Sequence, residues 1–292
     1  MQLSESDAVI QMLRAGGFKH GLRHGPKIFR TIFPSGVLVA IDRSTEKIIG
    51  FCLGVNIASD LGFVGGYCVL PEHRGKGVGQ SLWASAMANM GDRNVGLFAV
   101  SDTMGDIYKI RCGFKFIPDR RVVNMAGNVE VNDNVVKSID GITLCPINDE
   151  LLPLVSKYDS IVTNGLDRKD YINEVIKSPD TWNLVAINEN QEVVGYCIVY
   201  VAIAEITMCG PLYADNEDIA ELLFSQCCLL LPQERRENFL YYTWNTNQKS
   251  ITIAKRLGLT YQLDRPALFN KQSINAQIDK QFCICNVYVY PF

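Results

Sequence analysis

Apolar runs of strand length alternate with polar turns over much of the first half of the chain. The runs at residues 36–41 and 47–57 are rich in β-branched side chains, and the polar segment Asp42-Arg43-Ser44-Thr45-Glu46 between them is typical of a hairpin turn. A third apolar run covers residues 63–70. The pattern therefore predicts three consecutive strands.

A glycine-rich segment, residues 71–79, separates these strands from a stretch with helical periodicity. Between residues 80 and 90, Leu82, Ala86 and Met90 recur every four positions, which places them on one face of a helix. This segment is therefore expected to pack one apolar stripe against the preceding strands.

The chain then returns to strand and helix patterns. Residues 94–100 form a further apolar run, and a short helix is expected from about residue 104 to residue 111, with Gly113 as its stop. The first half therefore runs strand, strand, strand, loop and helix, strand, helix, and ends in more strand.

The same order of motifs recurs about 145 residues later. The residues that match at this offset are Ile49-Gly50-Phe51-Cys52 with Val194-Gly195-Tyr196-Cys197, Gly65 with Gly210, and Gly113-Phe114 with Gly258-Leu259. Leu82-Trp83 instead matches Leu222-Leu223, so the second half lacks about five residues where the first half has its glycine-rich segment. We therefore predict two copies of one fold, residues 1–135 and 136–292, with the boundary between Val131 and Ile142.

Composition and charge exclude several classes of partner. The 292 residues suffice for two domains, and 48% hydrophobic residues, 20% charged residues and a mean hydropathy of +0.06 indicate a compact chain. A net charge of -3 without a long basic stripe argues against nucleic acid as a partner. With no apolar stretch of about 18 residues and no signal-peptide pattern at the start, we predict a soluble, cytoplasmic protein with no membrane partner.

The ten cysteines do not change this interpretation. Cys52, Cys68, Cys197 and Cys209 lie in apolar strand-like runs, Cys227-Cys228 lies in a helix-like run, and Cys283-Ile284-Cys285 alternates in a tail strand. Their spacings match no zinc pattern. We expect reduced, buried cysteines and no metal site.

The glycine-rich segment has the chemistry of an anion site. Arg74-Gly75-Lys76-Gly77-Val78-Gly79 follows a strand and opens a helix, where free backbone N–H groups and the positive helix end favour an anion. It is not a Walker loop, because Gly77 rather than Ser or Thr follows Lys76. It is not a dinucleotide fingerprint either, because the glycine spacing differs and the next strand ends at Val100-Ser101 without an acid.

Residues 69–79 resemble motif A of the GNAT N-acetyltransferase superfamily, whose core is Arg/Gln-x-x-Gly-x-Gly/Ala. Arg74, Gly77 and Gly79 fill its places. Tyr108 to Phe114 has the Tyr-x-x-x-x-Gly-Phe pattern of GNAT motif B. The resemblance is strong over about residues 36 to 120.

The second half is similar to the degenerate GNAT-like domain that follows the catalytic one in tandem members. The similarity rests on Asn164-Gly165-Leu166-Asp167-Arg168 and Gly210-Pro211-Leu212-Tyr213-Ala214-Asp215. The resemblance implies an α/β fold (α+β in some schemes) of two tandem GNAT-like domains, each a mixed, mostly antiparallel central sheet flanked by helices. The first domain would be catalytic, and the second would lack the pyrophosphate loop.

The resemblance implies acetyl-CoA as cofactor, held in a splay between the strands at residues 63–70 and 94–100. Ser101, where many members have asparagine, would hydrogen-bond it through the hydroxyl. Backbone groups of Tyr67, Cys68 and Val69 would pair with the pantetheine arm. The N–H groups of Gly75, Lys76, Gly77, Val78, Gly79 and Gln80 would hold the pyrophosphate, with added charge from Arg74 and Lys76.

Acetyl transfer to an amine needs a stabilised oxyanion, a proton for the departing thiolate and a neutral amine. The N–H of Val69 would serve the oxyanion. Tyr108 stands at the position of the family's general acid, and a phenol with a pKa near 10 can protonate a thiolate whose conjugate acid has a pKa of roughly 8 to 9.

No base is assigned. Gly96 stands where some members carry a glutamate. A water chain, Asp102 or Asp106 could take the proton, although the two aspartates also suit a helix cap and a surface charge. His20 and His24 lie in the segment that lines the acceptor site in this family.

We therefore expect an acetyl-CoA-dependent N-acetyltransferase that moves the acetyl group directly, in a ternary complex, to a primary amine of a small molecule or peptide. An acetyl-cysteine route is not favoured, because no cysteine has a histidine partner in the sequence. The alternatives are a non-catalytic acyl-CoA-binding sensor, which Gly96 favours, and an N-acyltransferase that uses a longer acyl-CoA. The sequence leaves the acceptor and the oligomeric state open.

The second half serves as an internal control for these roles. At the 145-residue offset Tyr108 becomes Ile253 and Gly96 becomes Tyr241, so this half should neither donate a proton nor bind CoA in the usual way. It would cover the acceptor cleft or add buried interface. Asp159, Asp167 and Arg168 could recognise substrate, or an Asp-Arg pair could cap a helix at residues 169–177.

Overall fold

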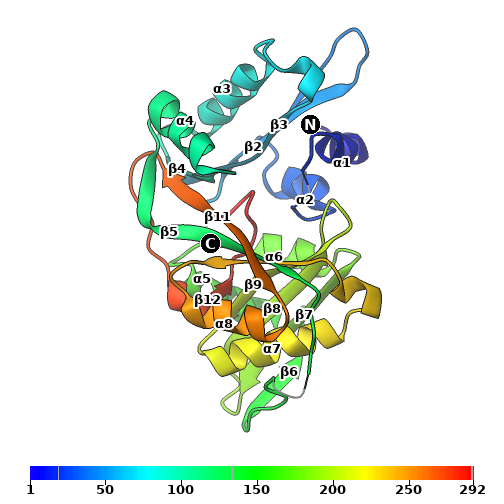
Figure 1. The fold of residues 1–292 in the computed structure, drawn as a ribbon, viewed down its shortest axis with the longest axis vertical. Coiled ribbons are helices and arrows are strands. Elements are labelled where there is room, and N and C mark those ends of the chain that lie inside the picture. Colours follow the sequence, from blue (N-terminus) through cyan, green and yellow to red (C-terminus); the bar gives the residue numbers. More distant parts are fainter. Residues whose placement is uncertain (19, 133–134, 291) are drawn as a thin grey trace.

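The computed structural model describes residues 1–18, 20–132, 135–290 and 292, without the side chains of residues 116–119. In these residues one continuous twelve-stranded sheet runs through both halves of the chain (Figure 1). Its strand order is β1-β2-β3-β4-β11-β5-β10-β9-β8-β7-β6, and β12 pairs with β9 at the side of this path. The mixed, mostly antiparallel sheet with flanking helices confirms the predicted fold class.

The first half contains the predicted elements within two or three residues of their expected ends. They are β1 (Val37–Ile41), β2 (Ile48–Asn56), β3 (Leu61–Val69), α3 (Val78–Met90), β4 (Asn94–Phe98) and α4 (Asp102–Cys112), with a 3-10 turn η2 (Pro71–His73) before α3. Leu82, Ala86 and Met90 are the buried residues of α3, as the periodicity predicts.

Two helices at the start of the chain were not predicted. They are α1 (Ser6–Ala15) and α2 (Gly25–Ile32), preceded by the 3-10 turn η1 (Leu3–Glu5). They cover the opposite face of the sheet from α3 and α4 (Figure 1). Val9, Met12 and Leu13 of α1 are buried at the spacing of an amphipathic helix.

The second half repeats this arrangement. Its strands and helices are β6 (Ile142–Cys145), α5 (Leu152–Val162), α6 (Lys169–Ile176), β7 (Thr181–Asn188), β8 (Val193–Val201), β9 (Thr207–Ala214), α7 (Glu217–Leu229), β10 (Phe239–Trp244), α8 (Gln248–Arg256) and β12 (Gln281–Cys283), with 3-10 turns η3 (Gln233–Arg236) and η4 (Ile278–Lys280). Each half contains one parallel pair of strands, β3 with β4 and β9 with β10.

The two halves exchange their last long strands. β5 (Lys115–Gly127) leaves the first half, and its last six residues pair with β10, from Gly127 opposite Phe239 to Val122 opposite Trp244. β11 (Thr260–Phe269) leaves the second half and pairs with β4, with Ala267 opposite Phe98. The residue ranges predicted for the domains therefore do not coincide with the strands that build each half of the sheet.

The parallel strands β3 and β4 stay together over only three residue pairs, from Leu61 opposite Asn94 to Phe63 opposite Gly96. Beyond them β3 bulges against β2, with one extra residue between Gly65 and Cys68. Gly66 in this bulge has φ +58, a left-handed conformation that glycine adopts without a steric penalty. The two strands therefore separate into a splay.

All ten cysteines are free, and only Cys112 and Cys145 are less than fully buried. In the described ranges no three or more His, Cys, Asp or Glu side chains form a group suited to a metal ion. Among the same residues no helix has the length and apolar character needed to span a membrane.

Candidate active site

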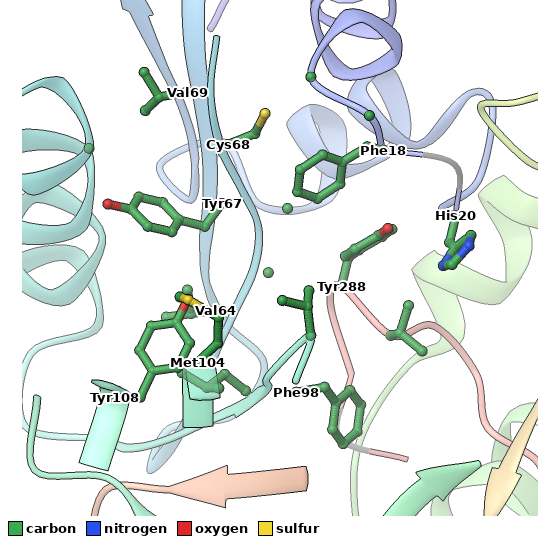
Figure 2. A pocket seen from close by; sticks show the side chains of 18 of the residues that line it. Phe18, His20, Val64, Tyr67, Cys68, Val69, Phe98, Met104, Tyr108 and Tyr288 are labelled. Atoms are coloured by element: carbon green, nitrogen blue, oxygen red, sulfur yellow. The ribbon is translucent and has the colours of Figure 1, made fainter. Parts of the chain in front are cut away.

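A cavity of about 890 Å³ opens at the splay between β3 and β4 (Figure 2). Its wall is built by strand β3, the segment before α3, helix α4, the segment after α1, strand β11 and the C-terminal tail. The first and second halves of the sequence thus both contribute to one site. The predicted site residues that line it are Tyr67, Cys68, Val69, Arg74, Gly75, Gly77, Gly79, Gln80 and Tyr108.

The segment before α3 presents unpaired backbone donors to this cavity. Gly75 and Gly77 have φ values of +73 and +83, which turn the chain sharply into α3, and no side chain caps the helix. The first amide bonded within this turn is that of Ser81, which donates to the Gly77 carbonyl over 3.0 Å. In the described part of the chain no acceptor pairs with the N–H groups of residues 75–80. This arrangement suits a bound anion.

Arg74 and Val69 interact directly. The Arg74 Nε donates to the Val69 carbonyl over 2.9 Å, so the guanidinium lies across the end of β3 beside the anion site. The amide of the next residue, Leu70, donates to the Ile49 carbonyl over 3.0 Å. Because strand amides alternate in direction, the N–H of Val69 points away from β2 and toward the splay.

Tyr67 and Cys68 project to opposite sides of β3, as neighbouring strand residues do (Figure 2). The Tyr67 ring packs edge-on against Trp83 of α3, with 5.8 Å between ring centroids, and a Cβ on Gly79 would lie 2.5 Å from its hydroxyl. Cys68 lies against the end of α1, where a Cβ on Gly16 would lie 2.4 Å from its Sγ. Burial raises the pKa of the Cys68 thiol. Because the reactive form of cysteine is the thiolate, this side chain is unsuited to act as a nucleophile.

Tyr108 faces the cavity from α4. Its ring stacks on Trp83, with 5.3 Å between centroids and 24° between planes, and Phe114 lies 6.3 Å away. Figure 2 shows it beside Met104 and Val64, across the splay from Phe18 and His20. Burial raises the pKa of Tyr108 above its usual value, so the phenol holds its proton at neutral pH.

Three predicted cofactor contacts do not line the cavity. Lys76 and Val78 are not among the lining residues, although their backbone amides belong to the anion site. Ser101 is the N-cap of α4, where its hydroxyl oxygen accepts a hydrogen bond from the Met104 amide over 3.2 Å. The hydroxyl oxygen therefore serves as the helix cap, and the O–H group remains a donor.

The structure explains why glycine stands at position 96. A Cβ there would lie 2.6 Å from the ring of Phe269 and 3.1 Å from that of Phe63. Phe269 belongs to β11, the strand supplied by the second half. The Phe269 ring, brought in by the strand exchange, therefore occupies the space that a side chain at position 96 would need, and no base stands at this position.

The two aspartates considered as bases lie outside the cavity. Asp102 forms an ion pair with Arg121 over 2.9 Å, and the hydrogen bond from Arg121 lowers the pKa of Asp102. Asp106 is exposed on α4 and does not line the cavity. His24 begins α2 and does not line it either.

The face of the cavity near α1 holds residues that sequence reasoning missed, apart from His20. Phe18, Tyr288 and Arg265 line this face, and the His20 Nδ1 hydrogen-bonds with the Tyr242 hydroxyl. Tyr288 and Arg265 come from the second half of the sequence, and no motif marks them. The tail passes so close to β3 that a Cβ on Gly65 would lie 1.9 Å from the Tyr288 carbonyl oxygen.

In the second half, chain fills the equivalent splay. β12 and the residues after it lie in the splay of β9 and β10, where the Ile284 amide donates to the Tyr242 carbonyl over 2.9 Å. Only Asp215 and Asn216 connect β9 to α7, and the Asn216 side chain caps the helix by accepting from the Ile219 amide. In this described two-residue connection there is no counterpart to the run of unpaired amides at residues 75–80.

Asp159 and Arg168 form a fully buried ion pair and do not line the cavity. The Arg168 Nε donates to Asp159 Oδ2 over 2.9 Å, and the Tyr196 hydroxyl donates to the same carboxylate. The expected helix cap is present in part, because Asp167 accepts from the Lys169 amide over 3.1 Å, whereas the Arg168 side chain makes no cap bond. The pair instead stabilises the core of the second half.

Comparison with known proteins gives two matches along the chain. The acetyltransferase (GNAT) family matches residues 7–114, and an acetyltransferase (GNAT) domain matches residues 155–283. An uncharacterized protein of Caenorhabditis elegans is 25% identical over 194 residues, which is 62% of this chain and 59% of that protein. The match thus spans less than two thirds of the relative's length.

Three solved structures share the fold over nearly the whole chain. A Pyrococcus horikoshii protein superposes with a TM-score of 0.75 at 16% identity, over 99% of this chain and 94% of the other. A tandem GNAT protein from the clavulanic acid biosynthesis pathway gives 0.65 at 15% identity, over 91% and 94%. A GCN5-related N-acetyltransferase from Sphaerobacter thermophilus gives 0.61 at 12% identity, over 95% and 96%. With a GNAT match in each half and this shared fold, the chain belongs to the GNAT acetyltransferases of tandem type.

Proposed function

We propose that the chain transfers an acetyl group from acetyl-CoA to a primary amine, in a ternary complex within the cavity between β3 and β4. The observation that carries this proposal is the run of unpaired N–H groups at residues 75–80, which opens directly onto the splay. These donors and the positive end of α3 fit a pyrophosphate. Arg74, whose guanidinium lies beside them, adds a positive charge.

The thioester supplies an activated acyl carbon when it is bound. The amine nitrogen forms a C–N bond to that carbon, the C–S bond breaks, and the proton lost by nitrogen balances the proton gained by sulfur. The Val69 N–H, turned into the splay, is placed to donate to the developing oxyanion. Tyr108, protonated and facing the cavity from α4, donates the proton to the thiolate, and water takes up the proton lost by nitrogen and returns one to the phenol.

Binding of acetyl-CoA to this segment can be tested with a matched pair of variants. Gly77 and Gly113 both have positive φ, and a Cβ on either one meets no other atom within 4 Å, but only Gly77 lines the cavity. Gly77→Asp therefore adds the strain of an L-residue and a negative charge at the anion site, whereas Gly113→Asp adds the same strain and charge elsewhere.

In a thermal-shift titration, acetyl-CoA at about 100 times its Kd should stabilise the wild-type protein by about 2.7 kcal/mol. We expect the shift to persist in Gly113→Asp and to vanish in Gly77→Asp. A wild-type protein that shows no shift with acetyl-CoA or CoA would contradict the proposed function. Titration with longer acyl-CoA thioesters in the same format measures the preference for acyl chain length.

A further inference from the structure

Arg265 reaches the cavity because of the strand exchange. β11 pairs with β4 up to Ala267 opposite Phe98, and the Ala99 amide then donates to the Pro266 carbonyl over 3.1 Å. Arg265 therefore lies just beyond the end of β4, where the splay opens, and it lines the same cavity as Arg74.

No carboxylate compensates the charge of Arg265 in the described part of the chain. Its guanidinium lies 5.6 Å from the centroid of the Tyr242 ring, and its buried Nε has no hydrogen-bond partner there. Burial raises the pKa of Tyr242 to about 12, so this phenol is neutral and supplies no counter-charge. Arg121 and Arg256, by contrast, pair with the carboxylates of Asp102 and Glu221.

The charges along the cavity wall disfavour an amine acceptor that carries several positive charges. Arg74 and Arg265 both line the cavity, and none of its described lining residues is an aspartate or a glutamate. An acceptor with several ammonium groups, such as a polyamine or an aminoglycoside, would meet no negative charge in this wall. An acceptor that carries its own carboxylate would pair with the uncompensated guanidinium.

Arg265 approaches the cavity from the face opposite Tyr108. Along β11, Ala267 belongs to the core that contains α1 and the tail, whereas its neighbour Leu268 belongs to the core under α3 and α4. Arg265 shares the face of Ala267, because side chains two apart on a strand point the same way. A carboxylate bound there lies on the side of the splay that carries Phe18 and Tyr288, away from the acid on α4.

We propose that the amine acceptor is a free amino acid whose carboxylate binds the Arg265 guanidinium and whose amino group is thereby directed into the splay. The proposal rests on the acyl-transfer function proposed above and narrows its substrate class. Arg265 acts as a specificity-determining residue: it holds the acceptor and takes no part in proton transfer.

The test uses the full-length protein, saturating acetyl-CoA and two matched series of acceptors. One series contains the common L-amino acids together with β-alanine and 4-aminobutyrate, which vary the spacing between amine and carboxylate. The other contains the corresponding primary amides, which keep the amine and lack the negative charge. Product formation is measured by mass spectrometry for wild type, Arg265→Gln, Arg265→Lys and Arg120→Gln.

We expect at least one amino acid to react with a kcat/KM about 100-fold above that of its amide. Arg265→Gln should remove this preference by lowering kcat/KM for the acid alone, and Arg265→Lys should restore part of it. Arg120→Gln is the control, because Arg120 binds the Ile274 carbonyl and does not line the cavity. An unchanged acetyl-CoA Kd shows that each variant is folded.

The remaining outcomes separate failure of the inference from failure of the proposed function. Equal rates with acids and amides, or an equal loss on both in Arg265→Gln, would overturn the inference and leave acyl transfer in place. Binding of acetyl-CoA without transfer to any member of either series would also overturn it. A protein that binds no acetyl-CoA would overturn the proposed function, and the inference with it.

Discussion

Each half of the chain contains a splay between two parallel strands, at equivalent positions of the repeat. The two splays differ in what occupies them. In the first half, β3 and β4 separate around a cavity. In the second half, β9 and β10 separate around β12, and the tail then continues to the first opening. The equivalent glycines show this: Gly210 faces the Ile284 and Cys285 carbonyls, and Gly65 faces Tyr288.

The difference follows from the connection between strand and helix. In the first half the long connection leaves the amides of residues 75–80 unpaired, which favours an anionic ligand. In the second half a two-residue connection ends in Asn216, which caps α7 with its own side chain. A splay without a ligand must still pair its strand edges, and β12 does so. The second half therefore contributes β11 and the C-terminal tail to the wall of the cavity in the first half.

The largest effect on activity is expected from a substitution of Tyr108. The equivalent residue of the second half is the buried Ile253, which cannot donate a proton. Tyr108→Phe should lower kcat by about 10²–10⁴-fold, because it removes the proton donor, and should leave the acetyl-CoA Kd unchanged. The raised pKa of Tyr108 keeps its acid form populated past pH 10, so the loss should be constant from pH 7 to 9.5. Tyr261→Phe, at an exposed phenol outside the cavity, is the control.

A kcat that is unchanged in Tyr108→Phe would remove the tyrosine from the mechanism. A loss that shrinks steadily as pH rises toward 9.5 would also contradict its role as a fully protonated acid. Both readings come from pH–rate profiles of the wild type and the two variants at saturating acetyl-CoA.

The next effect concerns stability and belongs to the second half. Asp159→Asn leaves the fully buried Arg168 charge uncompensated and should lower the free energy of unfolding by about 3–5 kcal/mol. Asp102→Asn, which breaks an exposed ion pair with Arg121, should cost at most about 1 kcal/mol. Urea unfolding of both variants measures the difference. Equal losses would show that burial does not set the strength of the Asp159–Arg168 pair.

The hydrophobic pattern sufficed to predict most strands and helices of the first half, because those elements bury one periodic face. The spacing of Val9, Met12 and Leu13 is the same kind of local signal, and it indicates the amphipathic helix α1. The anion segment was predictable too, because its glycines and its place before a helix are local features.

The pairing partner of a strand cannot be predicted in the same way. The alternation of apolar and polar residues shows which face of the strand is buried, but it does not show which neighbouring strand it pairs with. Residues 260–269 form a strand, and only the folded chain shows that they pair with β4. Arg265, Tyr288 and the blocked position at Gly96 all depend on such long-range pairing. Their roles therefore could not be derived from the first half of the sequence.

The smallest effect tests the two openings against each other. Gly65→Ala and Gly210→Ala each place a methyl group within 3 Å of the tail backbone, so each should cost about 1–3 kcal/mol of stability. Only Gly65 lines the cavity, so Gly65→Ala should also displace Tyr288 and raise the acceptor KM several-fold, whereas Gly210→Ala should leave KM unchanged. Urea unfolding and acceptor titration at saturating acetyl-CoA measure both effects. If Gly210→Ala raised KM as much as Gly65→Ala does, the second opening would be coupled to the first through the tail, and its filling by β12 would be more than structural.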